Sequence, residues 1–196
     1  VYDYIAEEIN NGNLKPGEKV NENQIIDHLK ISRTPVREAL IQLATEGFLE
    51  NIPRRGFVIR KIDAKEAAEI YEIIGLLDGF VAGQVCGNLT EQDYRGMEFY
   101  IESANLAIKT KNYDAYYKQQ EEFHDTYIKK SDNEALLNLL RQTKKKFLKK
   151  KYILPDEDAL DIELYDTNKE HKKMIEMFKA GDASGLETFI RDVHWR

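Results

Sequence analysis

The sequence predicts a mainly α-helical protein in which a short β-hairpin belongs to the N-terminal part and a bundle of helices forms the rest. Three of the four prolines, Pro16, Pro35 and Pro53, fall within the first 53 residues, whereas the remainder is nearly uninterrupted helix-forming sequence. Apolar residues beyond that point recur at helical spacing, as Ile70, Ile74 and later positions show. The 196 residues, 42% of them hydrophobic, suit two small globular domains with a boundary near residue 62.

Residues 1–30 are expected to form two helices separated by a turn. The first helix, over residues 2–10, ends at the Asn/Gly cluster NNGN, and the following LKPGEKV forms a turn with a short extended piece. Asn21 and Gln24 resemble a capping box, which opens a second helix that runs to about Leu29.

A third helix and a hairpin complete the N-terminal part. Thr34 is the expected cap and Pro35 the first helical residue, where the missing N–H costs nothing, and Gly47 is a natural stop. FLENI and FVIRK are short β-type runs joined by Pro53–Gly56, which is a hairpin signal. The order helix, helix, helix, hairpin predicts a winged helix-turn-helix domain over residues 1–62.

Residues 63–196 are expected to form an all-α helical bundle. Asp63 and Glu66 have the spacing of a capping box directly after the hairpin, so a new helix starts there. Gly, Asn and Pro residues mark the later breaks between helices. We expect six helices, at roughly 63–86, 90–110, 112–130, 133–152, 157–180 and 182–196.

Charge is distributed unevenly between the two parts. Residues 1–62 contain nine Lys/Arg and nine Asp/Glu, so the rest of the chain carries the whole net charge of −6. An acidic protein is not an indiscriminate nucleic-acid binder. However, the segment His28–Arg37 contains no acid, and Ile52–Lys61 contains four basic residues and no acid. The net charge therefore does not exclude nucleic-acid binding by the N-terminal domain.

The most specific segment of the chain is SRTPVREALIQLATEGFLENIPRRGFVIRKI. A recognition helix enters the major groove of DNA with its N-terminal residues near base edges, and Arg33, Thr34 and Arg37 cluster at that end. Arg is the usual bidentate partner of guanine, and the Thr hydroxyl can meet a phosphate. Arg55 and Gly56 lie at the hairpin tip, where they can approach the DNA backbone or the minor groove. Isolated arginines are usually solvated surface residues, but this ordered set points to DNA contacts.

This segment, with PGEKVNE before it, resembles the GntR family of bacterial transcription regulators. The resemblance covers residues 1–62 and implies a double-stranded DNA operator as a partner. It also implies DNA contacts by Arg33, Thr34, Arg37, Arg55 and Gly56. The chain departs from the family at Asn23, where an Arg within a Glu-Arg-Glu run is common.

Three of the four histidines lie on the inward stripes of three different expected helices. These are His124, His171 and His194, the last on the same expected inward stripe as Val193, whereas His28 belongs to the N-terminal domain. A single inward histidine is usually a hydrogen-bonded core residue. Three of them in one small domain favour convergence on a metal, because neutral imidazole binds Zn, Ni, Fe or Cu. Core packing and metal binding both remain open from the residues alone.

The C-terminal part resembles the FCD ligand-binding domain of the FadR-like branch of the GntR family. EEFHDTYIKKSDN matches the family's Phe-His helix, His171 and His194 match the next two positions, and about six helices fit the smaller VanR-type variant. The resemblance implies a divalent transition metal, such as Zn or Ni, on His124, His171 and His194. It also implies a small-molecule effector, commonly a carboxylate, and a homodimer formed through residues 63–196.

Two positions in the C-terminal part differ from the FCD pattern. Gln120 stands four residues before His124, where the family has a metal-binding Asp, so we count Gln120 among the metal ligands, with Glu121 as an alternative. Ile74 stands where an Arg often grips the carboxylate of the effector. Several tyrosines make the expected pocket aromatic, which suits a less charged ligand.

Two further features are expected to be structural. Lys144–Lys151 holds six lysines in eight residues and reads as a solvated helix, with a phosphate-rich effector or flanking DNA as alternative partners. Cys86 is the single cysteine, which excludes an internal disulfide and suits a reducing cytoplasm.

The function that the sequence predicts is ligand-responsive regulation of transcription by a homodimer on a palindromic operator in the bacterial cytoplasm. No stretch approaches the roughly 18–20 uncharged apolar residues that a membrane helix needs. Two alternatives stay open. Three histidines and a water form a catalytic zinc arrangement, which would make the chain a metal-dependent enzyme, and the bundle could also be a helical interaction module. The sequence does not specify the operator, the effector, or whether the chain represses or activates transcription.

Overall fold

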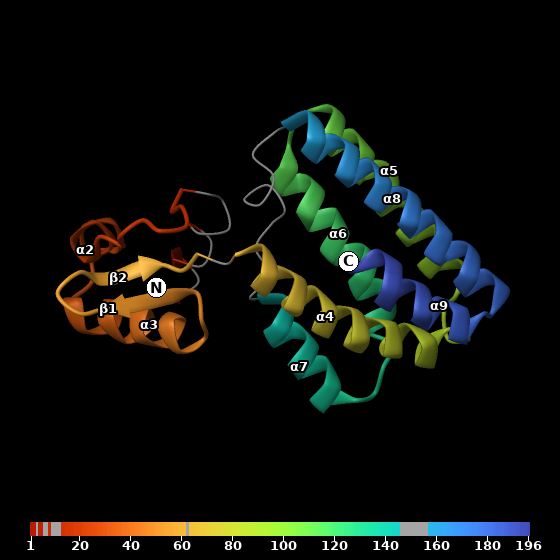
Figure 1. Cartoon of the computed structure of the whole chain (residues 1–196), viewed down its shortest axis with the longest axis horizontal. Coiled ribbons are helices and arrows are strands. Elements are labelled where there is room, and N and C mark those ends of the chain that lie inside the picture. Colours follow the sequence, from red (N-terminus) through yellow and green to blue (C-terminus); the bar gives the residue numbers. More distant parts are fainter. Residues whose placement is uncertain (3, 6–7, 9–12, 62, 146–156) are drawn as a thin grey trace. The chain divides into compact units, whose positions relative to one another are not determined.

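The computed structural model describes residues 1–2, 4–5, 8, 13–61, 63–145 and 157–196. The described chain is mainly helical with one two-stranded antiparallel sheet, so the predicted fold class is confirmed (Figure 1). It divides into two compact units, Val1–Asp63 and Ala64–Arg196. The expected first helix, residues 2–10, falls largely outside the described residues. No helix in the described ranges combines the length and the apolar character that crossing a membrane requires.

The first unit contains two described helices and a hairpin around a small core. Its elements are α2 (Glu22–Leu29), α3 (Arg33–Thr45), β1 (Leu49–Ile52) and β2 (Gly56–Ile59). The Asn21 side chain accepts hydrogen bonds from the backbone N–H groups of Asn23 and Gln24, which confirms Asn21 as the cap of α2. The core is formed by Ile5, Val20, Ile25, Val36, Leu40, Leu43, Leu49, Phe57 and Ile59.

Helix α3 begins two residues earlier than we expected. Its cap is Ser32, in an extended conformation, so the assignment of Thr34 as the cap is wrong. Pro35 still lies in the first turn, where the backbone N–H groups have no partner inside the helix, so either start is compatible with this proline. At the other end, Phe48 N–H donates to the Leu43 carbonyl and Gly47 has a φ of 85°, which confirms Gly47 as the stop.

The second unit is a bundle of helices. Its elements are α4 (Ala64–Val85), α5 (Glu91–Lys109), α6 (Tyr113–Ile128), α7 (Glu134–Lys145), α8 (Glu157–Ala180), α9 (Ala183–Phe189) and the π-helical turn η2 (Ile190–His194). α4 packs against α6, α7, α9 and η2, and α5 packs against α6 and α8. Helix α7 is described to Lys145. The rest of the expected helix 133–152, with Lys146–Lys151 of the lysine run, lies outside the described residues.

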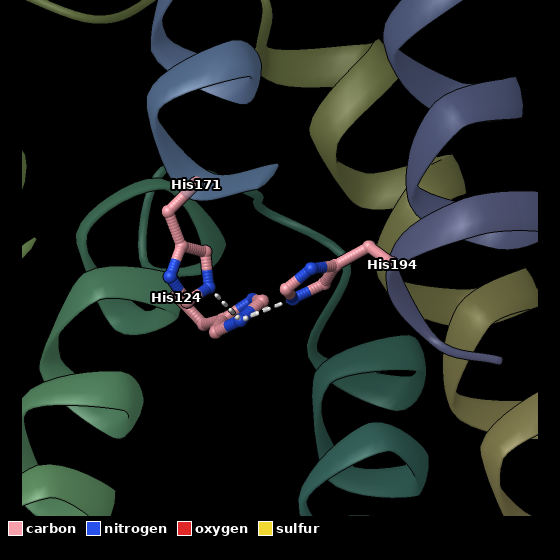
Figure 2. A group of neighbouring side chains, drawn as sticks. All are labelled: His124, His171 and His194. Carbon is pink, nitrogen blue, oxygen red and sulfur yellow. Dashed lines mark hydrogen bonds between the residues drawn. The ribbon is translucent and has the colours of Figure 1, made fainter. Parts of the chain in front are cut away.

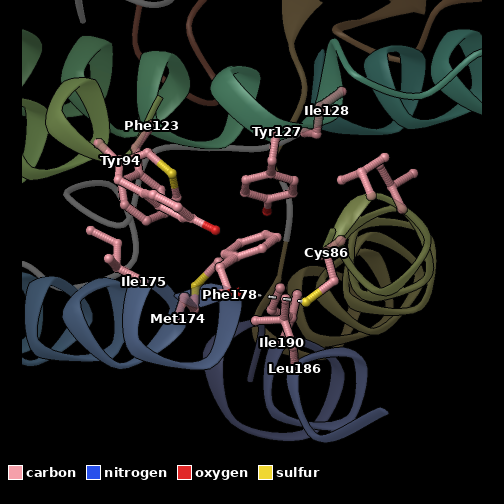
Figure 3. Close-up of a cluster of buried hydrophobic side chains, with 14 of the residues drawn as sticks. Cys86, Tyr94, Phe123, Tyr127, Ile128, Met174, Ile175, Phe178, Leu186 and Ile190 are labelled. Carbon is pink, nitrogen blue, oxygen red and sulfur yellow. Dashed lines mark hydrogen bonds between the residues drawn. The ribbon is translucent and has the colours of Figure 1, made fainter. Parts of the chain in front are cut away.

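A large apolar cluster fills the interior of the second unit (Figure 3). Tyr127 and Phe123 reach it from α6, Phe178 reaches it from α8, and their side chains are almost completely buried. Cys86 is buried in the same cluster, in agreement with its expected structural role. The cluster includes residues of α6, α8 and η2, the three elements that carry His124, His171 and His194.

Three glycines allow the end of the chain to pack directly on α4. Gly75, Gly79 and Gly83 recur every four residues, and an ideal Cβ at each would lie close to the backbone of the last helix. At Gly79 that atom would be 2.7 Å from the carbonyl oxygen of Glu187, and at Gly75 it would be 3.1 Å from the carbonyl oxygen of Arg191. Because these glycines have no side chains, the α9–η2 segment can lie in close contact with the backbone of α4.

The last turn of the chain is wider than an α-helix. Trp195 N–H donates to the carbonyl of Ile190, five residues earlier, at 3.2 Å. Val193 was expected to face inward with His194, and this is wrong, because Val193 is 46% exposed and His194 is 7% exposed. The wider turn shifts the inward face, so that His194 enters the interior while Val193 points to solvent.

Candidate metal centre and nucleic-acid interface

Helix α3 has a buried face and an exposed N-terminal end. Val36, Leu40 and Leu43 are fully buried against the core of the first unit. Arg33, Thr34 and Arg37 are exposed. The residues singled out from the sequence for DNA contact are thus accessible, and the apolar face holds the helix in place.

The N-terminal end of α2 contacts both arginines of α3. Arg33 Nη2 donates to Asn23 Oδ1 at 2.9 Å, and Arg37 Nε lies 3.8 Å from Glu22 Oε2. The Arg37 side chain is 61% exposed, so this ion pair is weak in water. The hydrogen bond from Arg33 to Asn23 was not anticipated, because nothing in the sequence indicates which partner an exposed guanidinium will take.

The turn between β1 and β2 forms the tip of the wing. Leu49 pairs with Ile59 and Ile52 pairs with Gly56, which leaves Pro53, Arg54 and Arg55 in the turn. Arg54 has a φ of 64° and Gly56 a φ of 85°. A side chain would be strained at the φ of Gly56, so the local geometry favours glycine at this position. The two turn arginines are exposed.

Three histidines from distant parts of the chain converge inside the second unit (Figure 2). His124 comes from α6, His171 from α8 and His194 from η2, and all three are buried. His124 Nε2 lies 3.2 Å from His171 Nε2 and 3.2 Å from His194 Nε2. The structure therefore brings together the three histidines that the sequence analysis selected.

The proton on His124 is fixed by its surroundings. Asp78 Oδ2 accepts hydrogen bonds from Trp195 Nε1 at 2.9 Å and from Lys144 Nζ at 3.2 Å. His124 Nδ1 lies 3.0 Å from the same oxygen. Because Asp78 Oδ2 already acts as an acceptor, Nδ1 of His124 must carry the hydrogen and donate it. The Nε2 atom of His124 therefore keeps its lone pair and faces the other two rings.

The other two rings have the same arrangement. His194 Nδ1 lies 2.9 Å from Glu170 Oε2, and His171 Nδ1 lies 3.4 Å from Asn168 Oδ1. The Asn168 Nδ2 group donates to Asn105 Oδ1, which identifies the atom that faces His171 as the amide oxygen. Each Nδ1 thus faces an oxygen acceptor, and three Nε2 lone pairs point toward one another. Such an arrangement is repulsive unless a cation lies between them.

The donor set fits a divalent transition metal. With Zn–N bonds of about 2.0–2.1 Å and tetrahedral angles, two imidazole nitrogens lie about 3.3 Å apart. The Nε2 atom of His124 lies 3.2 Å from that of His171 and 3.2 Å from that of His194, which agrees with this value. Metal-binding histidines generally donate their other N–H to a carboxylate or carbonyl oxygen, as these three do. The residues present therefore fit such a metal.

Burial favours the neutral form of His124 and His171, which metal ligation requires. Burial lowers the pKa of His124 to about 4, although Asp78 acts in the opposite direction. Burial and the two neighbouring rings hold the pKa of His171 well below its usual value. Burial by itself would raise the pKa of the Asp78 carboxyl, but Lys144 and His124 outweigh it and hold this pKa well below its usual range.

Comparison with known families assigns both units. Residues 1–59 match the family described as "Bacterial regulatory proteins, gntR family". Residues 69–193, more than half of the chain, match the FCD domain. The chain belongs to the GntR family. Within it, the FCD domain supplies the three-histidine cluster, and the GntR-type head supplies the exposed arginines.

Similar proteins are other regulators of this family. The Nta operon transcriptional regulator of Aminobacter aminovorans is 33% identical over 132 residues, which cover 65% of this chain and 60% of that protein. The probable D-xylose utilization operon transcriptional repressor of Paenarthrobacter nicotinovorans is 28% identical over 182 residues, covering 93% of this chain and 78% of that protein. The chain spans about 60% of the length of the first curated relatives that it matches.

The fold also resembles that of solved GntR-family structures. The structure of E. coli McbR/YncC aligns with a TM-score of 0.81 at 21% sequence identity, covering 98% of this chain and 91% of that one. At this level of identity the similarity shows a shared fold.

Gln120 stands four residues before His124, where the resemblance to the FCD domain implies a metal-binding Asp. Its Nε2 donates to Tyr116 Oη at 2.6 Å and to Asn168 Oδ1 at 3.1 Å. A ligand role for Gln120 would therefore use its carbonyl oxygen. Glu121, the alternative ligand, is exposed and does not join the metal-capable cluster of the described residues. It lies on the outer side of α6, because a helix turns Glu121 away from the face that carries Gln120 and His124.

Two further positions were singled out from the sequence in connection with the expected effector. Ile74, at the position where the resemblance implies an Arg, is fully buried in the apolar cluster. Lys144, the first residue of the lysine run, reaches the buried Asp78 and lies over the ring of Trp195. The expectation of a wholly solvated lysine face is therefore wrong at Lys144, because a buried carboxylate draws its ammonium group inward.

The residues that orient the histidines were not predicted from the sequence. These are Asp78, Glu170, Asn168 and Trp195. Asp78 alone carried a signal, since it interrupts the apolar stripe of α4 between Ile74 and Ala82. An acid on a buried stripe needs a partner, so this position could have been marked. The other three could not be selected without knowing how the helices pack.

Proposed function

We propose that this chain is a ligand-responsive transcription regulator that binds a palindromic DNA operator as a homodimer in the bacterial cytoplasm. The observation that carries the proposal is the pair of exposed arginines at the start of α3, next to a wing whose tip is basic. A recognition helix uses this end to approach base edges in the major groove.

Five residues are proposed to contact the operator. Arg33 and Arg37 would read bases, most naturally guanine, and Thr34 would meet a phosphate. Arg55 and Gly56 would place the wing against the DNA backbone or in the minor groove. Arg33 leaves its hydrogen bond with Asn23 only if a base offers a better acceptor, so Asn23 is proposed to influence the operator preference.

A homodimer would form through the second unit. Helix α4 exposes three large apolar side chains at positions i, i+3 and i+7 of one face: Ile73 at 47%, Leu76 at 50% and Phe80 at 43%. Exposed apolar faces of this kind mark interaction surfaces. Two copies that pair there would present two recognition helices to a symmetric operator, which adds affinity and specificity.

The effector would bind at the three-histidine cluster. His124, His171 and His194 are proposed to hold a divalent transition metal such as Zn or Ni, with the Gln120 carbonyl as a further ligand. When bound, the ion supplies Lewis acidity and open positions for a small molecule. All of these protein ligands are neutral, so the ion keeps its positive charge, and an anionic effector such as a carboxylate is favoured.

Regulation is preferred to catalysis because the similar proteins are named as transcription regulators. Two of them are named as repressors, which favours repression over activation. A metal-dependent enzyme or a helical interaction module would leave the exposed arginines of α3 and the wing without a role.

The test is binding of the full chain to the DNA upstream of its own gene, measured by fluorescence anisotropy at fixed salt. We expect specific binding at least about 10³-fold tighter than binding to unrelated DNA of equal length. Equal affinity for both DNAs would overturn the proposal. Metal content after dialysis, measured on the same preparation, tests the proposed centre separately.

A further inference from the structure

Asp78 connects several elements of the second unit. Its side chain is completely buried on α4 and accepts hydrogen bonds from α6, α7 and the C-terminal end of the chain. We infer that Asp78 is the positioning residue of the metal centre, because it aims His124 at the ion and anchors the turn that carries His194. This inference rests on the proposed metal centre and goes beyond its ligand set.

The two carboxylate oxygens of Asp78 have different partners. Tyr127 Oη donates to Oδ1 at 2.6 Å. Oδ2 accepts from His124 Nδ1, Lys144 Nζ and Trp195 Nε1 at 2.9–3.2 Å. Tyr127 Oη also lies 2.7 Å from His124 Nδ1, so both partners of Nδ1 act as acceptors. His124 can therefore not turn its ring without losing a buried hydrogen bond.

The same carboxylate holds a second ligand indirectly. Trp195 directly follows His194, and its indole N–H donates to Asp78 at 2.9 Å. The indole ring and the His194 ring lie 5.3 Å apart in an edge-to-face arrangement. Fixing the indole thus restricts the π-helical turn from which His194 reaches the cluster. Asp78 acts on two of the three ligands.

Lys144 offsets the cost of burying the Asp78 carboxylate. A buried carboxylate is costly unless it is paired and hydrogen-bonded. The Lys144 ammonium lies 3.2 Å from Asp78 Oδ2 and 5.2 Å from the centroid of the Trp195 ring. The pair lets Asp78 remain an anion beside the histidines, where a carboxylate that accepts from imidazole strengthens the metal–nitrogen bond.

The experiment compares metal binding by the wild-type chain, Asp78→Asn and a matched control. Asp161→Asn is the control, because Asp161 also pairs with a lysine and a tyrosine, Lys111 and Tyr113, but contacts none of the histidines. Co²⁺ is the spectroscopic probe, and Zn²⁺ affinity is measured by chelator competition. Circular dichroism verifies that each variant is folded.

We expect Asp78→Asn to lower Co²⁺ and Zn²⁺ affinity by about 10–100-fold and to change the visible Co²⁺ spectrum. Asp161→Asn should bind both metals like the wild type and give the same spectrum. A folded Asp78→Asn variant with wild-type affinity and spectrum would overturn the inference while leaving the centre itself intact. A wild-type chain that binds neither metal would overturn the proposed centre, and the inference would fall with it.

A second measurement needs no variant and remains decisive if Asp78→Asn fails to fold. The ¹⁵N chemical shifts of the histidine side chains in the wild-type chain report which ring nitrogen carries hydrogen. We expect His124 to carry it on Nδ1 both without metal and with Zn²⁺ bound. Hydrogen on Nε2 of His124 in the metal-free protein would show that Asp78 does not orient the ring.

Discussion

A Cβ atom on Gly79 would lie 2.7 Å from the carbonyl oxygen of Glu187, a distance that real Cβ contacts essentially never show. Helix α4 and the last helix are therefore as close at this point as their backbones allow. Gly79 directly follows Asp78 on α4, and Glu187 lies on α9, which leads into the turn η2 that carries His194. The distance between α4 and α9 at this contact therefore affects whether His194 can approach His124 and whether Trp195 can donate to Asp78.

Replacing Gly79 with Ala should destabilise the second unit. The new methyl group meets backbone that cannot move aside easily, at an overpacking cost of about 1–3 kcal/mol, partly offset by the better helix propensity of Ala. Urea unfolding followed by circular dichroism measures the effect. Gly87→Ala is the control, because nothing lies within 4 Å of a Cβ there. Equal unfolding midpoints for Gly79→Ala and wild type would show that the helices are not in tight contact.

Arg37→Ala should weaken operator binding. A bidentate contact to a base is worth about 1–3 kcal/mol, and a dimer loses it twice. The matched control is Arg95→Ala, which removes the same charge from an exposed position on α5. Both variants are titrated with operator DNA at the same salt concentration. If Arg37→Ala binds as tightly as Arg95→Ala, the recognition surface is assigned wrongly.

Leu76→Glu should convert the proposed dimer into a monomer. A charge at the centre of the exposed apolar face of α4 cannot be buried against a second copy without a large desolvation cost. Sedimentation of the full chain at tens of micromolar measures the mass. Leu106→Glu, at another exposed apolar position on α5, is the control. A wild-type monomer, or a Leu76→Glu dimer, would contradict the proposed interface.

Metal binding should respond to two substitutions in opposite directions. His171→Ala removes one of three imidazole ligands, so the variant should retain no metal after dialysis. Chelator should lower the melting temperature of the wild type but leave that of His171→Ala unchanged. Gln120→Asp replaces a neutral oxygen with a charged one and should tighten Zn²⁺ binding. Metal content after dialysis and thermal melting provide the measurements. A wild-type chain whose melting is unaffected by added Zn, Ni or Mn would refute a metal centre.

The metal-free protein should lose stability as the pH falls from about 6.5 to about 4. The unfolded chain protonates His124 near its ordinary pKa of 6.5, whereas burial lowers the pKa in the folded state to about 4. The unfolded state then binds more protons, so the free energy of unfolding decreases by about 3 kcal/mol across this window. His171 acts in the same direction. Urea midpoints that do not change between pH 7 and 5 would contradict the buried neutral rings.

Local sequence signals predicted much of the fold. Asn21 caps α2, Gly47 ends α3, and Pro53–Gly56 joins two strands, because each of these features depends on residues only a few positions apart. The start of α3 was misplaced because Ser32 and Thr34 are both good caps, and the choice between them depends on how the chain enters the helix.

The three-histidine cluster was predictable only in part. His124, His171 and His194 could be chosen because each lies on an inward stripe. The hydrogen bonds of Asp78 depend on side chains 49, 66 and 117 positions away, and no local pattern records such contacts. Val193 was placed inward because a regular helix was assumed, and a π-helical turn leaves no signature in a single sequence.

An ion held by the three histidines would constrain the chain as a cross-link does. His124 is 47 positions from His171 and 70 from His194, so an ion bound to all three would close two long loops. Closing such loops costs the unfolded chain conformational entropy, whereas the folded bundle already holds the three residues together. The bound ion would therefore favour the folded state. Release of the ion would then require the C-terminal turn to open locally, and the exchange rate of the metal would report how often α9 and η2 detach from α4.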